Sequence, residues 1–278
     1  MKLALSTLDA NNEEFLKNCR EAGIHAVEIS VASVKGADSL NFPELKAFSE
    51  KYGVELLSFH LPFDPFGIID PSVPELADHT ITYFCSLIDK AAAVGIRVFV
   101  IHASGEPIED ADRKQRMECA KHTLFALAEY AKKYDAVIAV EDLPRTCLGH
   151  NSAEIEDLIS AHPNLRVCFD TNHLLSEKDE DFVKKLGSKI ITTHISDYDM
   201  VDEKHWLPGE GLIDWASLKS ALEEVGYNGP WLYELRLCGS MPTIDRPRSL
   251  DFSDIRHNYE EITSGYTPTP IGTPKKFS

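Results

Sequence analysis

Eight short apolar, β-branched segments alternate with longer, charge-rich segments along the chain, and this alternation constrains the fold more than any other feature. Strands that alternate with helices form a parallel sheet, and the connecting helices cover it. The predicted strands span residues 2–6, 26–30, 54–60, 97–102, 136–141, 166–170, 190–195 and 231–236. Eight such units predict an α/β fold of one domain, the closed (β/α)8 TIM barrel.

The segments between the strands carry helix signals. The predicted helices span residues 13–22, 42–52, 74–94, 112–134, 153–161, 180–186, 215–225 and 249–262. Gly53, Gly95 and Gly226 follow the last turn of three of them, as is typical of helix C-termini. An open, doubly wound sheet is the alternative fold, but no GxGxxG motif follows the first strand and eight units are many for it. We therefore expect no nucleotide cofactor.

The eight units and the final helix account for residues 1–263, which we interpret as one barrel domain. Residues 264–278 are rich in proline, glycine, threonine and lysine and show no periodicity. This composition predicts an extended or disordered C-terminal tail.

The net charge of −17 limits the classes of partner. A field of that sign repels phosphodiester backbones, and no basic stripe overrides it, so we expect no nucleic-acid partner. No apolar run approaches the roughly 20 residues that cross a bilayer, and no signal-peptide pattern precedes the first strand. The sequence thus predicts a cytoplasmic protein without a membrane partner. Barrels of this size often self-associate, which leaves a homo-oligomer open, but no surface stripe identifies an interface.

The C-terminal ends of the predicted strands carry carboxylates and imidazoles, and catalytic groups of TIM barrels lie at these ends. Seven of the eight ends have such a group: Glu28, His60, His102, Glu141, Asp170, His194 and Glu234. Aspartate, glutamate and histidine are a minority of the chain, so chance placement explains this pattern poorly. We predict that the functional site lies at this mouth of the barrel.

Four of these groups form a coherent ligand set for one divalent metal ion. They are three carboxylates and one imidazole, from Glu141, Asp170, His194 and Glu234. Hard oxygen ligands with one nitrogen suit manganese, magnesium or cobalt, and zinc also fits, so the sequence does not select the metal. The alternative is a set of solvated carboxylates paired with nearby arginines. Three like charges that converge without a cation would repel one another strongly, which favours the metal.

A second group of side chains surrounds the same mouth. It consists of His60, His102, His173 and His205. We interpret these histidines as substrate contacts and acid/base helpers; they could also bind further metal ions or orient the carboxylates. Phe63, Phe66 and Trp206 could form an apolar wall on which a sugar packs. Arg236, two residues past Glu234 and on the same predicted strand face, could hold an anionic group.

The segment that follows the seventh predicted strand carries the most specific motif. Residues 205–215 read HWLPGEGLIDW, and Asp170 has a histidine three residues later. With the strand-end residues Glu141, His194 and Glu234, this pattern resembles the xylose isomerase-like TIM-barrel superfamily, and within it the sugar phosphate isomerase/epimerase group. The resemblance covers residues 1–263.

The resemblance implies one divalent metal ion, bound by Glu141, Asp170, His194 and Glu234. In the ketose epimerases of this group the two glutamates also act as an opposed acid/base pair. By that resemblance the chain is expected to be an isomerase or epimerase. Its substrate would be a small polyhydroxylated carbonyl compound, such as a sugar, a sugar phosphate or an inosose. A metal ion stabilises the enediolate that forms when a proton leaves the carbon next to the carbonyl.

The sequence departs from the ketose 3-epimerase pattern, which has an arginine where this chain has Met200, six residues after His194. An inosose dehydratase type of reaction therefore stays open. The endonuclease IV type of three-zinc enzyme is an alternative from another class, since His60, His102 and His173 match its further ligands and Glu203 with His205 is an approximate match to its Asp-x-His. The charge of −17, and Glu203 where that pattern has aspartate, argue against it. A noncatalytic sugar-binding relative is the third alternative.

Overall fold

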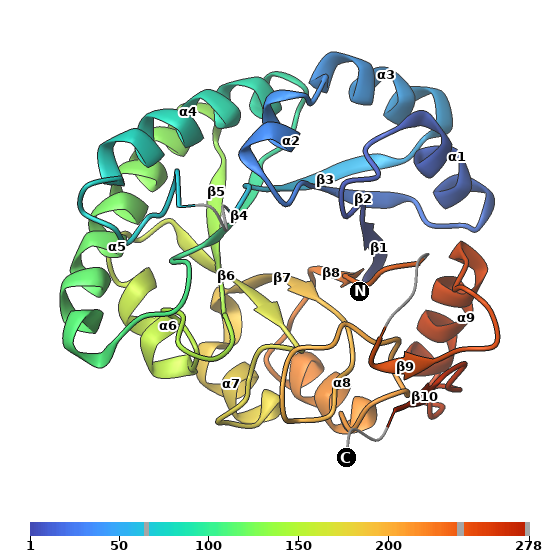
Figure 1. Ribbon diagram of the computed structural model, residues 1–278. Helices are drawn as coiled ribbons and strands as arrows, with labels where there is room; N and C mark the ends of the chain where they lie inside the picture. Colours follow the sequence, from blue (N-terminus) through green and yellow to red (C-terminus); the bar gives the residue numbers. More distant parts are fainter. Residues whose placement is uncertain (64–66, 238–241, 276–278) are drawn as a thin grey trace.

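Eight parallel strands form a barrel surrounded by helices, as the alternation predicts (Figure 1). The computed structural model describes residues 1–63, 67–237 and 242–275. The barrel strands are β1 (Lys2–Ser6), β2 (Ala26–Ser30), β3 (Glu55–His60), β4 (Val98–His102), β5 (Val137–Glu141), β6 (Leu165–Asp170), β7 (Ile190–His194) and β8 (Pro230–Tyr233). The predicted single-domain TIM barrel is therefore confirmed.

Neighbouring strands pair in the order β7-β6-β5-β4-β3-β2-β1-β8. Between β7 and β8, Ile195 forms a parallel bridge with Tyr233 and its N–H donates to the carbonyl of Leu232 at 2.7 Å. The carbonyl of Ile195 in turn accepts the N–H of Glu234 at 3.1 Å. These contacts join β7 to β8 and so close the barrel. The C-terminal ends of all eight strands therefore meet at one mouth.

The helices form the outer layer. They are α1 (Glu13–Glu21), α2 (Val34–Asp38), α3 (Phe42–Tyr52), α4 (Ala77–Ala93), α5 (Asp110–Ala131), α6 (Ser152–Ile159), α7 (Asp179–Leu186), α8 (Trp215–Glu224) and α9 (Phe252–Thr263). We did not predict α2, which is only one turn long and is capped by Ser33. The predicted helix 112–134 ends at Ala131 and continues as the 3-10 turn η1 (Lys132–Tyr134). This turn ends at Asp135, which adopts a left-handed conformation with φ 51°.

Side chains of each strand alternate between two apolar layers. Leu3 and Leu5 of β1 pack in the large cluster that includes the helices, whereas Ala4 packs with Ala26 and Leu232 of the neighbouring strands in a small cluster of its own. We assign that small cluster to the barrel interior.

The chain after β8 differs from the prediction. The regular strand ends at Tyr233 rather than at residue 236, and beyond it Glu234 is buried whereas Arg236 is exposed. Further on, β9 (Ile244–Asp245) pairs antiparallel with β10 (Thr273–Pro274). Part of the C-terminal segment beyond residue 263 is thus paired with the chain that follows β8. Among the described residues no helix is long and apolar enough to cross a membrane.

The loop between β5 and α6 is anchored by Glu154 of α6. Its carboxylate accepts hydrogen bonds from Nε and Nη2 of Arg113, both at 2.7 Å, and from the N–H of Gly149 at 2.9 Å. Burial alone would raise the pKa of Glu154, but His150, Arg113 and Gly149 lower it to about 2. The anchored loop begins at the end of β5, directly after the strand-end residue Glu141.

Replacing Glu154 with glutamine is expected to reduce the free energy of unfolding at neutral pH by about 1–3 kcal/mol, because Arg113 loses its partly buried anionic partner. The pKa of Glu154 is lower in the folded protein than its usual 4.5, so its contribution is present above pH 4.5 and is lost as the pH falls towards 2. Urea unfolding at several pH values checks this. The control is Glu156→Gln, at an exposed position of the same helix. A stability difference between wild type and Glu154→Gln that does not change with pH would contradict the prediction.

Candidate metal centre and substrate cavity

The structure brings the four predicted metal ligands together. Each offers one atom, and these atoms of Glu141, Asp170, His194 and Glu234 all lie within 4.8 Å of one another. Nδ1 of His194 is the centre of the group: it lies 3.0 Å from Oε1 of Glu141, 3.3 Å from Oε2 of Glu234 and 3.7 Å from Oδ2 of Asp170. All four side chains are buried, and three come from the ends of β5, β6 and β7. The arrangement could therefore hold one cation at the mouth.

Asp170 provides a test of whether a cation fits there. Its Oδ2 is fully buried and has no hydrogen-bond partner among the described residues. Buried carboxylate oxygens are normally hydrogen-bonded or bound to a cation. Burial is also the main reason that the pKa of Asp170 rises to about 7. Three buried carboxylates around one imidazole nitrogen form a donor set that fits a divalent ion.

Glu28 orients His194, a role that we did not predict. Oε1 of Glu28 lies 2.9 Å from Nε2 of His194, and Oε2 accepts a hydrogen bond from the hydroxyl of Ser58 at 2.7 Å. With its proton on Nε2, His194 donates a hydrogen bond to Glu28. The lone pair of Nδ1 then faces the space between the carboxylates, where a metal ion would bind. We counted Glu28 among the strand-end residues, but it lies at the centre of β2, a fully buried and otherwise mostly apolar strand.

Replacing Glu28 with glutamine is expected to weaken divalent-metal binding by about 10–100-fold, because an amide no longer enforces the Nε2 proton of His194. Calorimetric titration with Mn²⁺ or Co²⁺ measures this change. Glu55→Gln is the control, since Glu55 lies exposed on the neighbouring strand β3. Equal affinity of wild type and Glu28→Gln would show that Glu28 does not orient a ligand.

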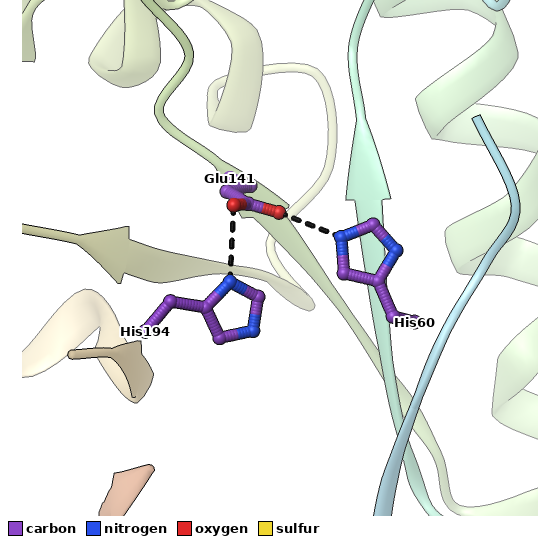
Figure 2. A group of neighbouring side chains, drawn as sticks. All are labelled: His60, Glu141 and His194. Atoms are coloured by element: carbon purple, nitrogen blue, oxygen red, sulfur yellow. Dashed lines mark hydrogen bonds and ion pairs between the residues drawn. The ribbon is translucent and has the colours of Figure 1, made fainter. Parts of the chain in front are cut away.

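His60 and His102 contact Glu141. Figure 2 shows the Glu141 carboxylate between His60 and His194, with Nε2 of His60 at 2.9 Å from Oε2. Nδ1 of His60 donates to the carbonyl of Leu61 at 2.8 Å. Burial opposes protonation of His60, but Glu141 outweighs it and raises the pKa to about 9. His60 therefore orients Glu141, the alternative role given above, whereas His102 is partly exposed at 3.2 Å from the same oxygen.

His173 and His205 lie at a second cluster beside the first. Nδ1 of His173 donates to the carbonyl of Asp142 at 2.7 Å, which leaves its Nε2 facing Glu203 at 3.8 Å. Nε2 of His205 lies 2.8 Å from the same carboxylate. His173, Glu203 and His205 are also close enough to hold a metal ion. His205 has a left-handed backbone with φ 52°, a strained conformation that the surrounding loop must impose.

Arg145 forms ion pairs with three carboxylates at the wall of the mouth. It pairs with Glu106 and lies 2.8 Å from Asp202 and 3.1 Å from Glu203, so it joins the loops after β4, β5 and β7. Those carboxylates raise the pKa of Arg145 further above its usual range. Arg145 thus stabilises the wall of the mouth, while the exposed Arg236 stays our predicted contact for an anionic group.

The mouth opens into a cavity of about 1310 Å³. Its lining includes Glu141, Glu234, His60, His102, His173, His205, Phe63 and Arg236. Phe63 stacks on His102 with ring centres 5.0 Å apart, so it lies in the predicted aromatic wall. Trp206 is placed differently from our expectation: it is 2% exposed and does not line the cavity. Phe66 lies outside the described residues.

Asp197 holds the loop that carries His205, and sequence reasoning missed it. Its Oδ2 accepts the N–H of Gly209 at 2.8 Å and the indole N–H of Trp215 at 3.0 Å. A Cβ added at Gly211 would lie 2.2 Å from Oδ1 of Asp197, which explains why glycine occupies that position. The backbone of Asp197 also pairs with that of Trp206 at 2.8 and 2.9 Å. The glycines of the motif therefore allow the loop to close around one buried carboxylate.

Comparison with known proteins adds independent information. The model of the family described as Xylose isomerase-like TIM barrel matches residues 16–247. A D-psicose 3-epimerase of Enterocloster bolteae is 22% identical over 81% of this chain and 77% of its own length. An inosose isomerase of Bacillus velezensis is 24% identical over 53% of this chain and 56% of its own. A D-tagatose 3-epimerase-like protein of known structure has a TM-score of 0.80 at 22% identity, covering 95% of this chain and 97% of its own.

Proposed function

Because the chain belongs to the xylose isomerase-like TIM barrel family, we propose that it is a divalent-metal-dependent sugar isomerase or epimerase. Relatives that are D-psicose 3-epimerases and an inosose isomerase support an enzyme of the isomerase class that acts on a small sugar. The observation that carries the metal dependence is the convergence of Glu141, Asp170, His194 and Glu234, with one buried oxygen of Asp170 that has no hydrogen-bond partner among the described residues.

The four proposed metal ligands differ in their exposure to the cavity. Glu141 and Glu234 line the cavity, whereas Asp170 and His194 do not. Only a group that faces the substrate can exchange a proton with it. We therefore assign proton transfer to the two glutamates. Asp170 and His194 would only bind the metal ion. A bound divalent ion would supply positive charge that stabilises a developing oxyanion.

Neighbouring histidines set the charge of Glu234 and the orientation of Glu141. Burial raises the pKa of Glu234, but in the metal-free protein the charge of protonated His194 outweighs it and lowers the pKa below the usual value. A metal ion bound to neutral His194 would supply positive charge in its place, so the carboxylate is ionised and can accept a proton. Glu141 is fixed from Oε2 by His60 and from Oε1 by His194, so its orientation is set before substrate binds. One glutamate, as the carboxylate, would remove the proton next to the carbonyl, and the other, in its protonated form, would return a proton from the opposite face. His102 and His173, which line the cavity, are proposed to contact substrate hydroxyls.

A screen for deuterium uptake from D₂O tests this function. D-psicose, D-tagatose, D-fructose and an inosose, with phosphorylated ketoses alongside, are incubated with the protein before and after removal of metal. We expect uptake next to a carbonyl in at least one sugar, dependent on added divalent metal. Silence across the panel would favour a noncatalytic sugar-binding protein, and metal-independent uptake would contradict the proposed centre.

The second cluster of possible metal ligands bears on the nuclease alternative. His173, Glu203 and His205 lie together, as a further metal site of a three-zinc enzyme would require. Metal analysis of the purified protein and incubation with an abasic-site duplex at physiological salt address this directly. We expect one tightly bound ion per chain and no incision. Three zinc ions together with incision would replace the sugar reaction by phosphodiester hydrolysis.

A further inference from the structure

Glu210, in the loop between β7 and α8, joins three segments that are far apart in the sequence. Its side chain is fully buried and pairs with Arg246. Oε1 accepts Nε of Arg246 at 2.9 Å and the N–H of Gly272 at 2.7 Å, and Oε2 accepts the N–H of Leu207 at 2.9 Å. The carboxylate therefore links the loop to β9 and to the C-terminal segment. None of the roles proposed above for the site uses this residue.

The C-terminal segment lies tightly against the loop. A Cβ added at Gly209 would lie 2.5 Å from the carbonyl oxygen of Pro268, and one added at Gly272 would lie 2.6 Å from Cγ of Arg246. Thr269 anchors the segment to α9 through two hydrogen bonds to Glu261, at 2.6 and 2.8 Å. Figure 1 shows β9 and β10 together beside α9. We call residues 268–275 the C-terminal strap.

The loop that the strap covers carries side chains of the candidate site. Trp206 donates its indole N–H to the hydroxyl of Thr243 at 3.0 Å, next to β9. The preceding residue, His205, lies with Nδ1 at 3.2 Å from the carbonyl of Glu234 and faces the ring of His173 at 5.9 Å. Because the backbone of His205 is strained, its position depends on how firmly the flanking residues are held.

We propose that Glu210 is a positioning residue for the proposed reaction: with Arg246 it closes the C-terminal strap over the loop and so holds His205 beside Glu234. This inference rests on the proposed function for its effect on turnover, but its structural part stands alone. Buried, hydrogen-bonded ion pairs fix one arrangement of the chain, since an unpaired partner would leave a buried charge. The strap thus extends the site to a segment that follows the last barrel helix.

Gly272→Ala in the full chain tests the proposal, because its methyl group would separate Glu210 from Arg246. Two quantities are measured: kcat and KM for deuterium uptake by D-psicose or the best substrate of the screen, and amide hydrogen exchange along the chain. We expect kcat to fall by about 10–100-fold with metal affinity unchanged. Exchange in residues 204–211 should become faster while the barrel strands stay protected. Tyr266→Ala, at an exposed position just before the strap, is the control and should match wild type.

Three further variants keep the test decisive if Gly272→Ala does not fold. Thr243→Val removes only the acceptor for Trp206 and should give the same effects in weaker form. Arg246→Lys, which keeps the charge, should retain more activity than Arg246→Met. Unchanged exchange in residues 204–211, or faster exchange with kcat within twofold of wild type, would overturn the proposal. A wild-type protein without turnover would instead refute the proposed function, and amide exchange would still decide whether the strap holds the loop.

Discussion

Replacing Glu234 with glutamine is expected to lower the rate of deuterium uptake by substrate by about 10²–10⁴-fold, the usual contribution of a positioned acid or base. Glutamine keeps the size of the side chain but cannot accept the proton. Glu234 lines the cavity, lies 3.3 Å from Nδ1 of His194 and has a pKa below its usual value, so it is ionised at neutral pH. The same change at Glu141 should have a similar effect.

Two measurements separate this effect from a loss of folding or of metal. Metal content and melting temperature of Glu234→Gln are determined beside its kinetics, and Glu223→Gln, an exposed change on the outer helix α8, serves as the control. Full activity of Glu234→Gln would remove this residue from the reaction. A loss of activity that excess metal restores would make it a ligand without a role in proton transfer.

Adding a divalent ion to the metal-stripped protein is expected to raise the melting temperature by roughly 8–16 °C when the ion is present at about 1,000 times its Kd. At that excess, binding to the folded state alone contributes about 4 kcal/mol. The physical reason is that Glu141, Asp170 and Glu234 are buried carboxylates whose mutual repulsion a bound divalent cation would relieve. Thermal unfolding with and without chelator, repeated for several metals, measures the shift.

Asp170→Asn is the matched variant for this experiment. Burial already raises the pKa of Asp170 to about 7, so the amide should cost the metal-free protein little stability while it removes most of the shift on metal addition. An equal shift in wild type and Asp170→Asn would place the ion elsewhere, for example at His173, Glu203 and His205.

The sequence alone determined the barrel and the location of its site. Strand and helix periodicities are local properties, so β1, β2 and α3 begin and end at the predicted residues. Because parallel strands of a barrel all end at one mouth, the strand-end residues Glu141 and Asp170 could be predicted to lie together without knowledge of any contact. Short elements escaped prediction, since the single turn of α2 and the two-residue strand β9 carry too few residues for a periodic signal.

Only the tertiary structure decided which partner each side chain of the site has. Glu28 orients His194 across 166 residues of sequence, and His60 orients Glu141 across 81. Trp206, which we expected in an apolar wall for a sugar, is buried, and its indole N–H donates to the hydroxyl of Thr243. Such pairings depend on the direction of each side chain and on packing between distant segments. Local periodicity therefore gives the place of the site, whereas the contacts that set its charges and hold its loop arise only when the chain is folded.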